Sequence, residues 1–146
     1  SAARVVRLFG FDPKVAFVSH STFGQPLTSR TKHIRSAVDI LKEKNVDFEF
    51  DGDMQPDVAL SKEYEELYPF AKIVGKANIL IMPGQHSAAI SYKLMKTIGD
   101  AKVIGPLLIG LGLPIEIAPL RTSTSELINL ASIAAYSAEK IDYSNS

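Results

Sequence analysis

Short apolar segments alternate along this sequence with amphipathic ones, and this alternation constrains the fold more than any other feature. Residues 77–82 carry no charge and are apolar on both faces of an extended chain, which is typical of a strand inside a parallel sheet. Residues 15–18 are a second short apolar run between turn formers. Residues 46–50 alternate apolar and acidic side chains with the period of a strand. A further strand is predicted at 114–118.

Apolar residues at helical spacing predict helices between these strands. A helix with Ser29 as its N-cap has apolar residues at i, i+3, i+4 and i+7, and Asn45 closes it. Ser123 and Glu126 have the spacing of a capping box, which predicts the start of the last helix. The other predicted helices are 2–9, 56–67 and the segment after the turn at 83–85, and the last helix is expected to end at about 139.

Strands that alternate with helices predict one α/β domain with a mainly parallel sheet and helices on both faces. Residues 51–53 are expected to turn the chain, and 142–146 to fray. Ligands of such sheets bind beyond the carboxyl ends of the strands. The segments expected there are 19–30, 51–57, 83–87, 105–112 and 120–126.

Composition excludes several classes of function. The 16 basic and 16 acidic residues give a net charge of zero, which argues against nucleic acid as a partner. The absence of cysteine excludes disulfides, thiolate metal sites and a cysteine nucleophile, and fits a cytoplasmic location. No apolar run approaches the ~20 residues of a membrane span, so no membrane partner is expected. The N-terminus lacks a signal-peptide core and an initiating Met, and suggests a piece of a larger protein.

A loop rich in hydroxyl groups follows the first predicted strand. Ser19, Ser21 and Thr22, with Gly24, could hold an anion or a thioester carbonyl through hydrogen bonds. The same composition is common in loops that only cap neighbouring elements, and composition alone favours that interpretation. Neither GxGxxG nor GxxxxGK[ST] is present, so classical dinucleotide and P-loop sites are excluded.

The acidic and histidine candidates each have a structural alternative. Asp51, Asp53 and Asp57 could bind a cation, but turn and helix-cap roles explain them equally well, and no metal is predicted. His86 opens a helix after a buried strand, where it could donate to a substrate, act as a base or have only a structural role. His33 is expected on a solvated helix face.

Arg121 is the most informative single residue. It precedes Thr122 and Ser123 at the start of the last helix, where a guanidinium does not help helix stability. An anionic ligand would be attracted to that position. Phosphate or carboxylate recognition and an ordinary surface arginine are both consistent with the residue alone.

Several segments together resemble the phosphate acetyltransferase family. They are 15–21, 51–60, 77–83, 90–93 and 104–111, and their order and spacing cover nearly the whole chain. The variants at 51–60 and at His86-Ser87 are similar to the C-terminal phosphotransacetylase-like region of hybrid NADP-dependent malic enzymes. The resemblance implies about the second half of a two-lobed family domain related to the isocitrate/isopropylmalate dehydrogenase fold. Residues 1–146 would form this single domain fragment, with 114–140 packing on the missing lobe or a partner chain.

The same resemblance implies a function and partners. In hybrid malic enzymes, an N-terminal part of the polypeptide decarboxylates malate to pyruvate with NADP and a divalent metal. The C-terminal region is thought to bind acetyl-CoA or CoA as an effector and to support oligomerisation. The segment itself is therefore expected to need no cofactor and to form a homo-oligomer, specifically a homodimer.

The catalytic residues of the family can be compared position by position. Family members with transferase activity have a Ser before the arginine that corresponds to Arg121, and an Asp near the start of the following helix. This sequence has Leu120 and Leu127 at those positions, and Glu126 lies one residue, or ~100°, off the required face. The resemblance implies that acetyl transfer is lost while ligand binding persists. The implied ligand-binding residues are Arg121, Thr122, Ser123, Ser19, Ser21, Thr22, His86 and Lys93. The rivals are an active phosphate acetyltransferase and a purely oligomerising module.

Overall fold

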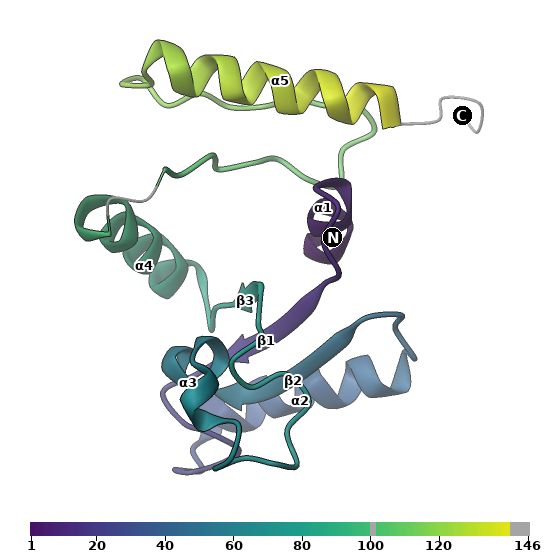
Figure 1. Ribbon diagram of the computed structural model, residues 1–146, viewed down its shortest axis with the longest axis vertical. Coiled ribbons are helices and arrows are strands. Elements are labelled where there is room, and N and C mark those ends of the chain that lie inside the picture. The colour runs from purple at the N-terminus through teal and green to yellow at the C-terminus, as the bar shows by residue number, and fades with distance from the viewer. Residues whose placement is uncertain (100–101, 141–146) are drawn as a thin grey trace. The chain divides into compact units, whose positions relative to one another are not determined.

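The computed structural model describes residues 1–99 and 102–140 (Figure 1). The tail predicted to fray at 142–146 lies outside these residues. The chain divides into two compact units. The N-terminal unit comprises residues 2–93, and the C-terminal unit comprises residues from 94 onward together with Ser1. None of the described helices is both long and apolar enough to cross a membrane.

The elements follow the predicted alternation of strands and helices. In chain order they are α1 (Ala2–Leu8), β1 (Lys14–Val18), α2 (Ser29–Glu43), β2 (Glu49–Met54), α3 (Pro56–Leu60), a 3-10 turn η1 (Lys62–Tyr64), β3 (Ile79–Ile81), α4 (Gln85–Ile98) and α5 (Thr124–Lys140). Helix α2 ends as predicted, with Asn45 at a positive φ of 48°. Its N-cap is Thr28 rather than Ser29, because Thr28 and Thr31 form a reciprocal capping box.

The three strands form a parallel sheet in the order β2-β1-β3. Both neighbours of β1 therefore come later in the chain, one on each side. The order of the strands reverses beside β1, and parallel sheets bind ligands beyond the carboxyl ends of the strands at such a point. In this unit those ends lead into the loop at 19–28, the start of α3 and the turn before α4.

Both faces of the sheet are covered by helices, as predicted. On one face, Ala3 of α1 packs with Val15 and Ile79. On the other, Ala16 packs with Met54 and with Val58 of α3. Alternate residues of β1 thus point into two small apolar cores, which is the arrangement expected for a central strand.

Strand β2 corrects two predictions. It runs over Glu49–Met54 instead of 46–50, so residues 51–53 are part of the strand and do not turn the chain. Pairing with β1 decides this, since Asp51 lies opposite Ala16 and Gly52 opposite Phe17. The register then shifts by one residue, and a bulge of this kind redirects a side chain.

Two further predictions are wrong, one in the length of a helix and one in the existence of a strand. The helix expected at 56–67 ends at Leu60, because Ser61 is extended and its side chain caps the next turn through the N–H of Glu63. No strand occurs between 102 and 123 in the described part of the C-terminal unit, so the prediction at 114–118 is wrong. An extended segment becomes a strand only by pairing with another, and within the described residues this one has no strand partner.

Candidate functional site

The hydroxyl-rich loop after β1 is held against the bulge of β2. Asp53 is fully buried, and its Oδ2 accepts a hydrogen bond from Ser21 Oγ and a longer one, 3.4 Å, from the N–H of Gly24. The Oγ atoms of Ser19 and Ser21 lie 3.2 Å apart. Ser19, Ser21 and Thr22 are all buried. The predicted loop residues are thus brought together, but the Ser21 hydroxyl is already used to hold the loop.

Main-chain contacts fix the same loop to the end of β2. The N–H of Phe23 donates to Asp53 O at 2.7 Å, and that of Ser19 donates to Met54 O at 2.9 Å. Thr22 Oγ1 accepts from the N–H of Gln55 at 3.2 Å. The loop is therefore a rigid extension of the sheet edge, and its observed contacts match the capping interpretation.

The other two acids considered as cation ligands also have local roles. Asp51 accepts from the N–H groups of Gly52 and Lys72, both at 2.9 Å. Asp57 Oδ2 accepts from the hydroxyl of Tyr64 at 2.9 Å, and this hydrogen bond raises the pKa of Tyr64. Across residues 1–99 and 102–140, no group of three or more His, Cys, Asp or Glu side chains could hold a metal ion.

His86 and Lys93 lie on α4, and both are exposed. His86 is the second residue of the helix, directly after the turn that follows β3. His86 therefore lies at the carboxyl edge of the sheet, after β3, which pairs with β1 on the side away from β2. The ligand-binding role predicted for His86 and Lys93 stays a prediction.

The remaining predicted residues belong to the C-terminal unit, in the turn before α5. Arg121 is exposed, and its guanidinium makes no hydrogen bond or ion pair with the described residues. The hydroxyl of Thr122 donates to Pro119 O. Ser123 donates to Glu126 Oε2 from its N–H at 2.8 Å and from its hydroxyl at 2.9 Å, while Glu126 N–H donates back at 3.3 Å. The predicted capping box is confirmed.

Glu126 already provides a negative charge at the start of α5. Lys96 Nζ lies 2.9 Å from Glu126 Oε1, and this hydrogen bond, with those from Ser123, lowers the pKa of Glu126 to about 2. At the two positions compared with the family's catalytic Ser and Asp, Leu120 is fully exposed and Leu127 is half exposed. Neither leucine offers a group that could bind or deprotonate a thiol.

Lys96→Met is expected to raise the pKa of Glu126 from about 2 toward its ordinary value of 4.5, because it removes the hydrogen bond that does most to lower the pKa of that carboxylate. Since the folded pKa lies below the unfolded one, the contacts of Glu126 stabilise α5 above about pH 4.5, and this contribution is lost as pH falls toward 2. Carboxyl ¹³C NMR titration measures the midpoint. Lys93→Met is the control, and a wild-type midpoint near 4.5 would contradict the ion pair.

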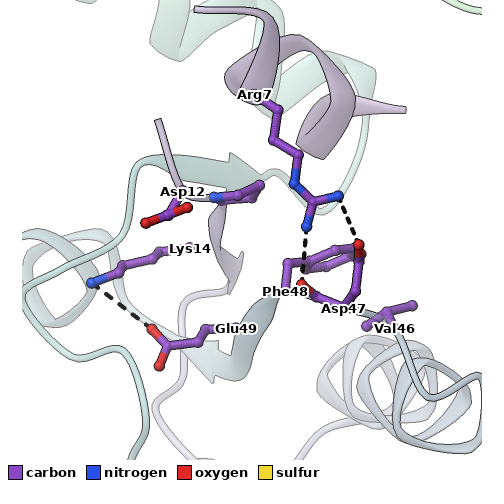
Figure 2. A pocket seen from close by; sticks show the side chains of 8 residues that line it. Arg7, Asp12, Lys14, Val46, Asp47, Phe48 and Glu49 are labelled. Atoms are coloured by element: carbon purple, nitrogen blue, oxygen red, sulfur yellow. Dashed lines mark hydrogen bonds and ion pairs between the residues drawn. The ribbon is translucent and has the colours of Figure 1, made fainter. Parts of the chain in front are cut away.

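A cavity of about 550 Å³ lies at the amino ends of β1 and β2 (Figure 2). Arg7 Nη1 lies 2.9 Å from Asp47 Oδ2, and Arg7 Nη2 donates to the main-chain oxygen of the same residue at 2.9 Å. Hydrogen bonding to Arg7 lowers the pKa of Asp47. Lys14 Nζ lies 3.8 Å from Glu49 Oε2. Both cations face carboxylates at the edge opposite to the carboxyl ends of the strands. Arg7 thus joins α1 to the segment just before β2, and Lys14 joins β1 to β2.

A second cavity, of about 440 Å³, lies at the carboxyl ends of the strands. We call it the aromatic cleft, and it is lined by Thr22, Phe23, Gln25, Gln55, Asp57, Val58, Tyr64, Tyr68 and Phe70. Sequence reasoning missed most of these residues. Residues 64–67 fall in the predicted helix 56–67 and residues 68–70 follow it, although three aromatic residues in these seven positions indicate a local cluster.

The N-terminal unit has a three-stranded parallel sheet whose loops gather at one edge, so the protein belongs to the α/β class. Among solved structures, the chain is similar to a phosphotransacetylase from Streptococcus pyogenes, with a TM-score of 0.88 and 32% identity over 94% of this chain and 42% of that one. The EutD phosphotransacetylase from Staphylococcus aureus has a TM-score of 0.84 and 31% identity over 93% of this chain and 43% of that one.

The phosphate acetyl/butaryl transferase family model matches residues 1–135, and the chain therefore belongs to this family. An NADP-dependent malic enzyme of Rhizobium meliloti (strain 1021) is 47% identical over 94% of this chain and 18% of its own length. A phosphate acetyltransferase of Thermoanaerobacterium thermosaccharolyticum is 34% identical over 95% of this chain and 43% of its own length. The chain is thus a phosphotransacetylase-like domain that spans about a fifth of the malic enzymes it matches.

Proposed function

We propose that this chain is a regulatory domain of an NADP-dependent malic enzyme, that it binds acetyl-CoA or CoA, and that it does not transfer acetyl groups itself. The identity to malic enzymes over nearly the whole chain supports this parent. In the proposed full-length protein, another part of the polypeptide converts malate to pyruvate with NADP and a divalent metal. We place this protein in the cytoplasm and its complete domain in the dehydrogenase-like fold class.

One observation carries the proposal: within residues 1–99 and 102–140, no base stands at the position where the family's transfer reaction needs one. Leu120 and Leu127 are apolar, and Glu126, the carboxylate next to Leu127 in the sequence, is held by Ser123 and Lys96. A carboxyl group with a pKa of about 2 is a weak base, and one already bound to two donors is not free to take a thiol proton. A domain that keeps Arg121 but lacks this base is suited to binding a CoA ester without turning it over.

Within this proposal, Arg121 contacts a phosphate of CoA or the acyl carbonyl. Arg121→Ala should weaken acetyl-CoA binding about tenfold to a hundredfold, since a charged hydrogen bond contributes ~1.5–3 kcal/mol. Calorimetric titration of the full-length protein measures the change. Arg4→Ala removes an exposed arginine on α1 and is the matched control. Equal affinities for acetyl-CoA in wild type and Arg121→Ala would remove Arg121 from the site.

The domain is also proposed to hold subunits together. Many large apolar side chains between 103 and 117 are exposed in the described C-terminal unit: Ile104, Leu108, Ile109, Leu111, Leu113, Ile115 and Ile117. Exposed apolar surface of this extent is typical of an interface. We expect a homodimer of this chain, so sedimentation that shows only a ~16 kDa species at micromolar concentration would contradict it.

An active phosphate acetyltransferase is the second candidate. The 34% identity to the enzyme of Thermoanaerobacterium thermosaccharolyticum favours it, because sequences this similar often share an activity. The two candidates differ in one measurable property, the transfer of acetyl between CoA and phosphate.

A further inference from the structure

We propose that the aromatic cleft binds an adenine ring. The cleft lies beyond the carboxyl ends of β1 and β2: Thr22 to Gln25 follow β1, and Gln55 directly follows β2. All of its lining residues belong to the N-terminal unit. Its volume of about 440 Å³ falls within the ~300–1,000 Å³ of small-molecule sites.

One wall of the cleft is aromatic. Ring centroids are 5.4 Å apart for Phe23 and Tyr68, 5.0 Å for Phe23 and Phe70, and 6.1 Å for Tyr68 and Phe70. The three rings support one another through tilted and edge-on contacts. Phe70 nevertheless keeps 69% of its surface exposed, which core packing does not explain. An aromatic wall of this kind binds planar bases by stacking, at ~1–3 kcal/mol per base.

The polar groups of the cleft match the edge of adenine. Asp57 lines the cleft, and its carboxylate, which accepts from the Tyr64 hydroxyl through Oδ2, is a hydrogen-bond acceptor there. Gln55 Nε2 donates to His20 O at 3.0 Å, which leaves its amide oxygen as a second acceptor. Two acceptors suit an exocyclic amino group, and the amide of exposed Gln25 can donate to a ring nitrogen.

Charge determines where the rest of the ligand lies. The lining contains a carboxylate and neither Lys nor Arg, so it disfavours a phosphate inside the cleft. Arg35 of α2 packs against Gly24, between the lining residues Phe23 and Gln25, since its Nη1 would be only 2.2 Å from a Cβ placed on Gly24. A phosphate attached to the adenosine is therefore expected at this edge, near Arg35. A small organic cation fits less well, because the three rings contact each other and do not surround a space.

Adenine can come from a CoA ester or from a free nucleotide. If it comes from acetyl-CoA, the inference rests on the proposed function. If it comes from AMP or a related nucleotide, the cleft is a separate site.

Calorimetric titration of the full-length protein with adenosine tests the inference. Adenosine should bind, and Phe70→Ala should weaken its binding about tenfold, because the stacking face is removed. Phe11→Ala, which truncates another exposed phenylalanine outside the cleft, should leave binding unchanged. Asp57→Asn should reduce the preference for adenosine over inosine, which lacks the amino group. No binding of adenosine, or equal affinity in wild type and Phe70→Ala, would overturn the assignment.

Two further ligands identify the source of the adenine. If Phe70→Ala weakens acetyl-CoA binding but not that of acetyl-pantetheine, which lacks the adenosine part, the source is the CoA ester. If it weakens AMP binding and leaves acetyl-CoA unaffected, the source is a free nucleotide, and either result supports the inference. Arg121→Ala should leave adenosine binding unchanged, since adenosine has no phosphate. The result for the aromatic cleft therefore does not depend on whether Arg121 binds acetyl-CoA.

Discussion

Full-length protein mixed with acetyl phosphate and CoA is expected to form no acetyl-CoA above the uncatalysed background. The CoA sulfur is an alkyl thiol whose pKa lies above the ~8.5 of a cysteine, so it is mainly protonated at neutral pH and needs a base to attack. A positioned base accelerates such a step by ~10²–10⁴-fold. Leu127 cannot supply one, and Glu126 is bound to Lys96 and Ser123 with a pKa of about 2.

A coupled assay of thioester formation measures this reaction. Turnover in the usual range of ~1–10³ s⁻¹ would contradict the proposed regulatory role and favour the active transferase. If acetyl-CoA forms at a rate below this range, the Arg121→Ala variant is the control. Activity that arises at this domain should fall in that variant, whereas activity from a contaminating enzyme should not change.

Gly52→Ala is expected to lower the free energy of unfolding by about 2–4 kcal/mol. Gly52 has a φ of 146°, a region that residues with a side chain rarely adopt. A Cβ at this position would lie 2.7 Å from Phe17 O and 2.8 Å from Phe17 Cβ. These atoms belong to the central strand, which is paired on both sides and cannot move away without breaking the sheet.

Chemical denaturation followed by circular dichroism measures this loss. Gly84→Ala is the matched control, because a Cβ there meets no atom within 4 Å and the stability should change by no more than ~0.5 kcal/mol. Equal stabilities of wild type and Gly52→Ala would show that β1 and β2 separate more easily than the structure implies.

The site was less predictable from the sequence than the fold. The hydroxyls of Ser19, Ser21 and Thr22 were identified as a group, but not their burial or the bond from Ser21 to Asp53. Asp53 lies at a bulge that exists only when β2 pairs with β1, so its partner cannot be read from spacing. The rings of Phe23 and Phe70 meet across 47 positions of the chain, and no local pattern connects them.

Features whose energetics are local could be predicted from the amino-acid sequence alone. Short apolar runs predicted β1 and β3, the spacing of apolar residues predicted α1, α2, α4 and α5, and Ser123 with Glu126 predicted a capping box. The position of β2 depends on long-range pairing, because Gly52 and Asp53 enter the strand through pairing with β1. The tertiary structure likewise decides that 114–118 is not a strand, since a strand requires a partner and its own residues cannot provide one.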